Sequence, residues 1–466
     1  MTVQTRPPEL DPAVERASLT EQLAEFVVDA RAEAVPAVVR EQAAWWVLDW
    51  LGCAIAGLET EPGRIFLQHA TDQPAGLASC LGLADGRAPQ AAALHNGGVS
   101  HIVEMDDVDR ASVIHPGAVV IPAALAVGER IGASGRDLLA AIALGYEVAI
   151  RVGESVGKTH YFYWHNTATC GVFGAAAAAG WLLGLDARRM TWALGSAGTQ
   201  AGGLWEFIAD GAMSKHLHTG RAAANGVLAA ELAALGFTGA RRILDGRQGF
   251  FAATAPDGNP SAVTADLGSG WKLLGVSIKP YPSCRHTHSA IDAALQLRRE
   301  HGLRIEDIER VDIAGYHSVL ELTDNPTPQH LYAAKFSVQY CVARALADGA
   351  VRLSDFSDER IADPAVRDLM ARTGVRLDQA LDARYPREFP AAVTVILRDG
   401  RTVRALVGSP KGDPENPLTA DELTAKFQKM LPGTPYEGRA EELLATMVGL
   451  DQLGNVRGLL ALGGDR

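Results

Sequence analysis

The feature that most constrains the fold is a succession of helical segments rich in glycine and alanine between residues 117 and 236. No alternation of apolar and polar residues typical of strands is sustained in this half of the chain. Spacings such as those of Gly171, Gly174 and Ala178 allow helix backbones to approach closely. The sequence therefore predicts one large all-α domain, with helices that include residues 118–131, 136–153, 171–183 and 220–235.

The character of the sequence changes after about residue 268. Three segments there are typical of strands, and the step Arg398-Asp399-Gly400-Arg401 before the third is a hairpin signal. These predicted strands cover residues 310–316, 391–397 and 402–407. Helices predicted over residues 289–301, 333–347 and 363–372 lie between the strands, which indicates a compact α+β domain.

Helical composition returns at residue 418, where Thr419 and Glu422 have the spacing of a capping box. We therefore expect the last helices to rejoin the first domain. The predicted fold is mainly α. A large all-α helical domain comprises residues 1–270 and is completed by residues 413–466, and a smaller α+β lid domain is inserted at residues 271–412.

Charge and cysteine content exclude several classes of function. The 466-residue chain has a net charge of −12, which argues against nucleic acid as a partner because phosphate binding needs a basic face. Five scattered cysteines without a C-x-x-C pair lack the usual zinc and iron–sulfur spacings and suit a reducing compartment. Residues 1–11 are too polar for a signal peptide, and no apolar run is long enough to span a membrane. We therefore expect a soluble, cytoplasmic protein that binds no membrane.

One cationic segment, residues 279–288, stands out and is called the strap below. Pro280 and Pro282 predict that the strap is an extended connector that leads into a helix. Fixed positive charge next to a helix N-terminus attracts a carboxylate, although a basic surface loop is the alternative. We expect the strap to contribute Lys279 and a set of substrate-binding residues, namely Tyr281, Ser283, Cys284, Arg285 and His286.

A second segment, residues 101–117, contains four carboxylates within six positions. Such groups repel one another, so that burial together would raise some of their pKa values. His101 and Glu104 are three residues apart and would be neighbours if the preceding helix extends that far. The segment is interpreted as a metal site, as a general acid/base cluster or as a helix end with solvated charges. Its candidate residues are His101, Glu104, Asp107 and His115.

Two further groups precede predicted helices. His165 follows an aromatic cluster and is interpreted either as a base in a shielded pocket or as a core histidine. Lys215 lies in a basic segment with His216 and His218. Converging helix N-termini closed by the strap would form a positively charged pocket that suits a substrate with two or three carboxylates. Removal of the α-proton of such a substrate requires a base, and cations to stabilise the enediolate.

Six motifs resemble the MmgE/PrpD family in the family's order along nearly the whole chain. The resemblance implies a large helical domain, a smaller α+β lid, a homodimer, and no metal or organic cofactor. Family members include 2-methylcitrate dehydratase, cis-aconitate decarboxylase and iminodisuccinate epimerase. The motifs are HIVEMDDVDRASVIHPG (101–117), WHNTATCGVFGAAAAAG (164–180), MSKHLHTGRAA (213–223), SIKPYPSCRHTHSAIDAAL (277–295), AAKFSVQYCVA (333–343) and GSPKGDPENPLTADEL (408–423).

The resemblance also implies residue roles. His115 or His165 takes the α-proton, Lys279 and Arg285 hold carboxylates together with Lys215, and Glu104 or Asp107 orients a histidine or protonates the leaving group. The catalytic residues implied are His115, His165, Lys215, Lys279, Glu104 and Asp107.

The threonine and the tyrosine of the decarboxylase pattern fall on Val108 and on about Leu322, which disfavours decarboxylation. The sequence therefore predicts a cofactor-free lyase for a small di- or tricarboxylate, most simply a hydro-lyase similar to 2-methylcitrate dehydratase. The alternatives are an epimerase of a dicarboxylate such as iminodisuccinate, a cis-aconitate decarboxylase-like enzyme and a non-catalytic carboxylate binder.

Overall fold

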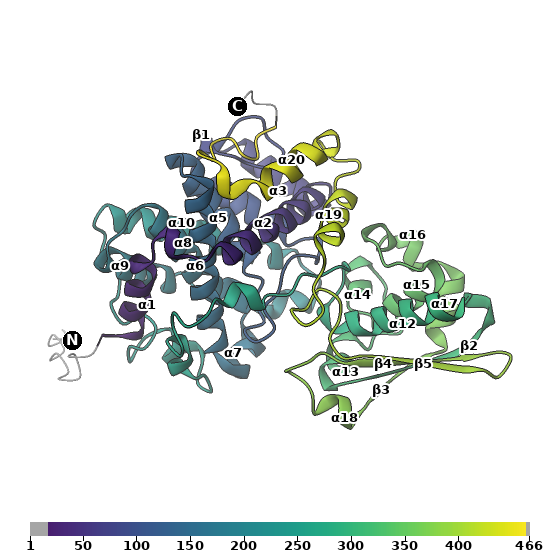
Figure 1. The fold of residues 1–466 in the computed structure, drawn as a ribbon. Helices are drawn as coiled ribbons and strands as arrows, with labels where there is room; N and C mark the ends of the chain where they lie inside the picture. Colours follow the sequence, from purple (N-terminus) through teal and green to yellow (C-terminus); the bar gives the residue numbers. More distant parts are fainter. Residues whose placement is uncertain (1–16, 463–466) are drawn as a thin grey trace, which may run out of the picture.

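The computed structural model describes residues 17–462, which form a large helical body beside a smaller unit that contains a sheet (Figure 1). Residues 1–16 and 463–466, which the predicted first domain includes, lie outside the described residues. None of the helices within residues 17–462 is long and apolar enough to cross a membrane. The helices of the body are α1 (Leu19–Asp29), α2 (Ala37–Leu58), α3 (Glu61–Thr71), α4 (Pro89–Ser100), α5 (Gly117–Ile131), α6 (Gly135–Glu154), α7 (Gly157–Tyr163), α8 (Asn166–Leu182), α9 (Ala187–Gly198), α10 (Ser214–Ala234), α11 (Phe250–Thr254), α19 (Ala420–Lys429) and α20 (Ala440–Val448).

Helices of the body pack backbone against backbone, as the small residues predict. A Cβ atom built on Gly174 of α8 would lie 2.4 Å from the carbonyl oxygen of Gly145 on α6, so neither position has room for a side chain. The capping box of α19 is confirmed, because Thr419 accepts from the backbone N–H of Glu422 and the Glu422 side chain accepts from that of Thr419. The prediction of an entirely α-helical domain is corrected in one place. Residues Ala75–Ala78 form a short strand, β1, which bridges to Arg87.

The smaller unit, called the α+β unit (residues 288–407), contains a four-stranded mixed sheet of order β3-β2-β4-β5. The predicted hairpin between β4 and β5 is confirmed, whereas the exposed edge strand β3, parallel to β2, was not predicted. The strands are β2 (Ile308–Gly315), β3 (Thr373–Leu377), β4 (Ala391–Leu397) and β5 (Thr402–Val407). The helices are α12 (His288–His301), α13 (His317–Thr323), α14 (Leu331–Lys335), α15 (Val338–Asp348), α16 (Asp358–Ile361), α17 (Pro364–Ala371) and α18 (Gln379–Asp382).

One helix predicted over residues 333–347 is divided in two by the structure. The hydroxyl of Ser337 accepts from the backbone N–H of Tyr340, so it caps a new helix, α15, while α14 ends at Lys335. The break places Lys335 at the end of α14, where its ammonium group donates to the backbone oxygen of Val103 in the body at 2.8 Å.

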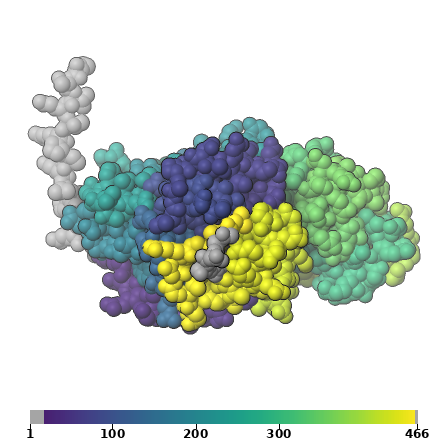
Figure 2. Space-filling model, turned by 90° about the horizontal axis from the view of Figure 1, so that it is seen from above, coloured from purple at the N-terminus to yellow at the C-terminus, as the bar shows by residue number. Residues whose placement is uncertain are grey.

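Buried apolar residues form two large separate cores, one in the body and one in the α+β unit. Residues of α19 belong to the first core, and Figure 2 shows the C-terminal segment in yellow lying against the body and reaching the green α+β unit. The chain passes between the two parts twice, and the two passages hydrogen-bond to one another. The backbone N–H of Ile278 donates to the oxygen of Gly412 at 2.9 Å, and the Ser277 hydroxyl donates to Asp413 at 2.7 Å.

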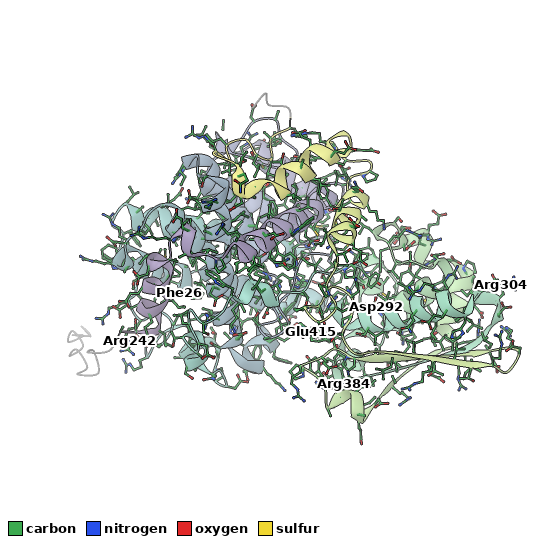
Figure 3. The ribbon with its side chains drawn as sticks, in the orientation of Figure 1. Phe26, Arg242, Asp292, Arg304, Arg384 and Glu415 are labelled. Carbon is green, nitrogen blue, oxygen red and sulfur yellow. The ribbon has the colours of Figure 1, made fainter. Side chains whose placement is uncertain are left out.

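The place where the two passages lie together is called the junction below. Figure 3 shows Glu415 and Asp292 close to the junction, with Arg304 at the far end of the α+β unit. Arg110 of the body binds the second passage through Asp413 at 3.1 Å and Glu415 at 2.8 Å. Side chains of the body and of the second passage therefore stabilise the junction.

Candidate active site

Residues 101–117 leave the end of α4 and continue as irregular backbone. Because α4 ends at Ser100, His101 and Glu104 are not neighbours on a helix face, which corrects the expectation from their spacing. Glu104 has φ = 60° and Val113 has φ = 53°, in the left-handed region that branched residues seldom adopt. Strained backbone of this kind is concentrated at functional sites, where the surrounding structure maintains it.

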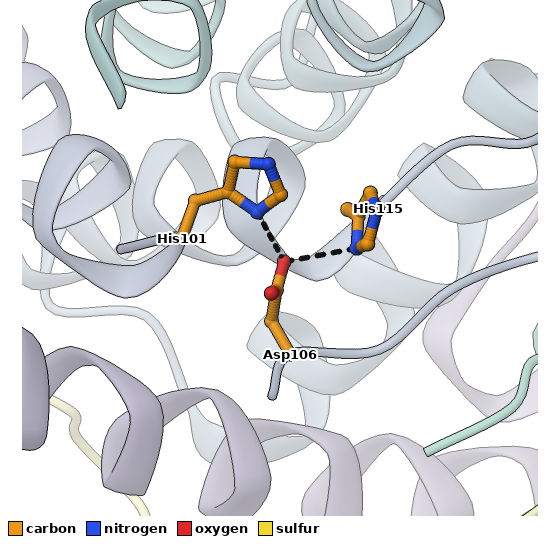
Figure 4. Close-up of side chains that lie close together, drawn as sticks. All are labelled: His101, Asp106 and His115. Atoms are coloured by element: carbon orange, nitrogen blue, oxygen red, sulfur yellow. Dashed lines mark hydrogen bonds and ion pairs between the residues drawn. The ribbon is translucent and has the colours of Figure 1, made fainter. Parts of the chain in front are cut away.

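Asp106 contacts two histidines with a single carboxylate oxygen (Figure 4). The Oδ2 atom of Asp106 lies 2.6 Å from His101 Nδ1 and 3.1 Å from His115 Nδ1, and the two imidazole rings are 4.6 Å apart. Burial alone would raise the pKa of Asp106, but the two histidines outweigh it and hold that pKa well below its usual range. The hydrogen bond between His101 Nδ1 and this carboxylate fixes the tautomer of the His101 ring and leaves its Nε2 atom as the basic nitrogen.

The same three residues are the metal-ligand candidates found within residues 17–462, with one ligand atom from each lying within 4.8 Å of the others. In this arrangement one carboxylate oxygen lies between two imidazole nitrogens. His101 is fully buried, and burial lowers its pKa to about 4, so that its imidazole is neutral at physiological pH.

Two buried lysines flank Glu104. The Lys215 ammonium group donates to Oε1 of Glu104, and the ammonium nitrogen of Lys279 lies 3.5 Å from Oε2. Burial alone would raise the pKa of Glu104, but the two ammonium groups outweigh it and hold that pKa well below its usual range. Burial lowers the pKa of a third lysine, Lys335, to about 8. Lys215 and Lys279 thus share one carboxylate, and Lys335 lies close enough for the charge of that carboxylate to act on it, which favours the binding of further anionic groups.

His165 connects this lysine group to the histidines. Its ring stacks on His101 at 5.7 Å, and its Nδ1 atom lies 3.3 Å from Nδ1 of His218. Burial lowers the pKa of His165 well below its usual range, and the ammonium group of Lys215 lies close enough to lower the pKa of both His165 and His101 further. The structure therefore brings His115, His165, Lys215, Lys279 and Glu104 into one buried cluster.

Asp107 stands apart from that cluster. Its carboxylate accepts from the Tyr146 hydroxyl at 2.7 Å and from the backbone N–H of Gly117 at 3.1 Å, so it caps the N-terminus of α5. Burial raises the pKa of Asp107 well above its usual value, and the nearby Asp106 carboxylate adds to this effect. The carboxylate that contacts the two histidines is that of its neighbour Asp106.

The polar side chains of the strap mostly bind other parts of the protein. Arg285 pairs with the buried Asp413 of the second passage and lies 2.9 Å from Nδ1 of His288. His286 lies 2.5 Å from the Tyr316 hydroxyl. These partners attach the strap to the junction and to the α+β unit.

Of the remaining strap residues, Tyr281 and Ser283 bond to side chains outside the buried cluster, whereas Cys284 lies close to the cluster. The Tyr281 hydroxyl donates to Asp292 at 2.5 Å, and the hydroxyl of Ser283 lies 2.9 Å from that of Thr287. Cys284 lies near the lysine group, and burial raises the pKa of its thiol to about 11. Within the strap, Lys279 and Cys284 thus belong with the cluster.

Four residues of the site were not among the predicted ones. Tyr332 lies beside Lys215, and burial raises the pKa of its hydroxyl to about 12, whereas Leu322, where a tyrosine was sought, is 45% exposed. The signal available in the sequence was the motif beginning at Ala333, which contains the lysine and directly follows the tyrosine. Nothing in the sequence distinguished the carboxylate of the histidine pair from its neighbours. The four residues are Asp106, His218, Tyr332 and Lys335.

A helical body, an α+β unit and a buried cluster of imidazoles, lysines and carboxylates are features of an enzyme suited to acid–base chemistry. The MmgE/PrpD N-terminal domain matches residues 21–262 and the MmgE/PrpD C-terminal domain matches residues 281–452. The chain therefore belongs to the MmgE/PrpD family and is an enzyme of the lyase type.

Relatives of known activity agree with this class. The chain is 29% identical to the cis-aconitate decarboxylase-like protein oryM of Aspergillus oryzae, over 96% of this chain and 97% of that protein. It is 27% identical to the cis-aconitate decarboxylase of Aspergillus terreus, over 96% of each chain. It is also 27% identical to the mitochondrial 2-methylcitrate dehydratase of Yarrowia lipolytica, over 35% of this chain and 34% of that protein.

Proposed function

We propose that the protein is a hydro-lyase that removes water from a small di- or tricarboxylate. The observation that supports this proposal is the buried cluster in which Lys215, Lys279 and Lys335 lie near the carboxylates of Glu104 and Asp106, beside neutral imidazoles. Because two carboxylates do not balance three ammonium groups, the site favours a substrate that brings carboxylates of its own.

In the proposed reaction, Nε2 of His115 takes the α-proton while Asp106 holds its other nitrogen. The broken C–H bond leaves an enediolate, which the lysines stabilise. His165 then gives a proton to the leaving hydroxyl, the C–O bond breaks, and water and an alkene form.

We propose that residues 271–412 act as a lid on the body, with the domain limits expected from the sequence. The separate core of the α+β unit and the contact between Lys335 and Val103 support this arrangement, because movement of the unit would open or close the lysine group. We also propose that the protein is a cytoplasmic homodimer. All five cysteines are free, in keeping with a reducing compartment.

Decarboxylation of a cis-aconitate-like acid is a second candidate, favoured by two observations. The decarboxylases match nearly the whole chain, whereas the Yarrowia dehydratase matches about a third of it. Tyr332 also supplies a tyrosine beside Lys215, which removes one of the two departures from the decarboxylase pattern. In that reaction the same lysines would stabilise the carbanion left by carbon dioxide, and His165 would protonate it.

One experiment separates these reactions. A panel of di- and tricarboxylates, including 2-methylcitrate and cis-aconitate, is followed by NMR in deuterated buffer. Loss of water supports the hydro-lyase, and release of carbon dioxide supports the second candidate. Deuterium uptake at the α-carbon without elimination identifies an epimerase. Thermal stabilisation by an acid that is never consumed identifies a binder and overturns the proposal, and loss of activity after chelation would revive a metal site at His101, Asp106 and His115.

A further inference from the structure

A cavity of about 640 Å³ lies beside the buried cluster, on the side of α10 and the loop before it. Leu204 and Leu217, which line it, are 53% and 46% exposed, so the cavity opens to solvent. Its lining also includes Trp164, Arg221 and His218. The cavity borders the site through His218, which contacts the proposed acid, His165.

His218 occupies the position between this cavity and His165. It lies one turn after Lys215 on α10, lines the cavity, and approaches Nδ1 of His165 to 3.3 Å with its own Nδ1. Aromatic rings hold the pair, with Trp205 4.7 Å from the His165 ring and Phe207 5.6 Å from the His218 ring. Two imidazole nitrogens at this distance share one hydrogen, which one ring donates and the other accepts.

A buried acid needs a way to regain its proton. His165 is 1% exposed, and the neighbouring His101, Lys215 and Lys279 are equally shielded from water. Each dehydration takes one proton from the acid and leaves one on the base, and each decarboxylation consumes one proton outright, so the acid must be reprotonated before the next turnover. His218 is the imidazole that joins His165 to the open cavity.

We propose that His218 relays protons between water in this cavity and His165. The inference rests on the proposed role of His165 as the acid. When His165 gives its Nε2 proton to the substrate, its Nδ1 takes the proton of His218 Nδ1, and His218 Nε2 takes a proton from a hydronium ion or buffer acid in the cavity. One N–H bond breaks and one forms at each ring, so both imidazoles remain neutral. The transfer runs backwards to reset the pair: His165 Nε2 takes a proton from water in the emptied site, to which the base returns its own proton, the Nδ1 proton of His165 goes back to His218 Nδ1, and His218 Nε2 releases a proton to the cavity.

Burial and the ammonium group of Lys215 lower the pKa of His218 to about 4, and burial lowers that of His165 further. Both rings are therefore neutral at physiological pH, which is the state that a concerted relay requires.

The test compares His218→Gln, His218→Phe and the matched cavity variant Arg221→Gln in weakly buffered and imidazole-buffered solution. Both His218 variants should lower kcat by about tenfold to a hundredfold in weak buffer with KM unchanged. Added imidazole, which fits the cavity, should restore much of the rate, while Arg221→Gln should behave as wild type in both buffers.

Because glutamine keeps a hydrogen bond to His165 but cannot relay a proton, full activity of His218→Gln would show a positioning role and overturn the relay. A loss that imidazole does not relieve would also overturn it.

A measurement without substrate distinguishes failure of the relay from failure of the proposed function. In histidine labelled with nitrogen-15, His218→Phe should shift the Nδ1 resonance of His165, because it removes the partner of that nitrogen. An unmoved resonance overturns the relay, whatever the substrate is. If the resonance shifts but the protein turns over none of the acids, the imidazole pair is present and the proposed reaction is wrong. The role of the relay in that reaction is then wrong as well.

Discussion

Residues 101–117 and the strap, residues 279–288, are alike in sequence, since each places histidines and charged side chains in a connector that leads into a helix. In the structure the side chains of the two segments have different partners. His101, Asp106 and His115 contact one another within a buried cluster. In the strap, Arg285 pairs with Asp413 at the junction and His286 contacts Tyr316. The difference shows that a high density of titratable groups indicates a buried polar network, and that the partners decide whether the network is free to act on a substrate.

The largest expected effect tests the buried cluster of residues 101–117. His115→Ala removes the proposed base, so kcat should fall by about a hundredfold to ten thousandfold while the protein remains folded. The measurement is steady-state turnover of the acid identified by the NMR panel, with circular dichroism to verify folding. His317→Ala is the matched control, because His317 forms a similar pair with Asp382 at 2.6 Å on the surface of the α+β unit. A near-normal rate for His115→Ala would contradict the site.

The second effect concerns stability and tests the strap. Arg285→Met leaves the buried Asp413 without one of its cationic partners, so the free energy of unfolding should fall by about 3–5 kcal/mol. Turnover by the folded fraction should change by only a few fold. Urea unfolding and kcat measured on the same preparation check both quantities. Unchanged stability together with a large loss of kcat would return Arg285 to the substrate site and remove the contrast between the two segments.

A smaller effect distinguishes positioning from direct catalysis within residues 101–117. Asp106→Asn keeps the shape of the side chain but removes the charge that holds the two Nδ1 atoms, so kcat should fall by about tenfold to a hundredfold with KM little changed. Asp382→Asn in the surface pair should alter neither quantity. A loss as large as that of His115→Ala would indicate that Asp106 itself contacts the substrate.

The smallest effect is confined to acid solution. The folded-state pKa of Glu104 lies below its ordinary value of 4.5, so its ionised form stabilises the fold fully above that value. The stabilisation is lost as the pH falls from 4.5 through the folded-state pKa, because the unfolded chain then binds the proton more readily. Relative to Glu104→Gln, the wild-type protein should therefore lose stability below about pH 5, with parallel behaviour above about pH 6. Urea unfolding at several pH values measures the difference. Curves that remain parallel down to pH 4 would mean that the lysines do not stabilise this carboxylate.

Local structure followed from local sequence. Small-residue helices such as α8, the capping box at Thr419 and the hairpin between β4 and β5 were predicted because each depends on residues within a few positions of one another. Strand β3 was not predicted, since a short exposed edge strand lacks an apolar pattern. The end of α4 at Ser100 was not predicted either, because the strained backbone at Glu104 is maintained by distant contacts.

By itself, the sequence determined a mainly helical protein with an α+β unit, the family, and which imidazoles and lysines were candidates. Only the tertiary structure decided that Asp106 and not Asp107 meets the histidines, that Lys335 and Tyr332 join the lysine group, and that the strap's arginine belongs to the junction. The physical reason is the length of chain between partners. Lys215 and Glu104 are separated by 111 positions, and Lys335 and Val103 by 232, so these contacts arise from the packing of whole helices and leave no periodic pattern in the sequence.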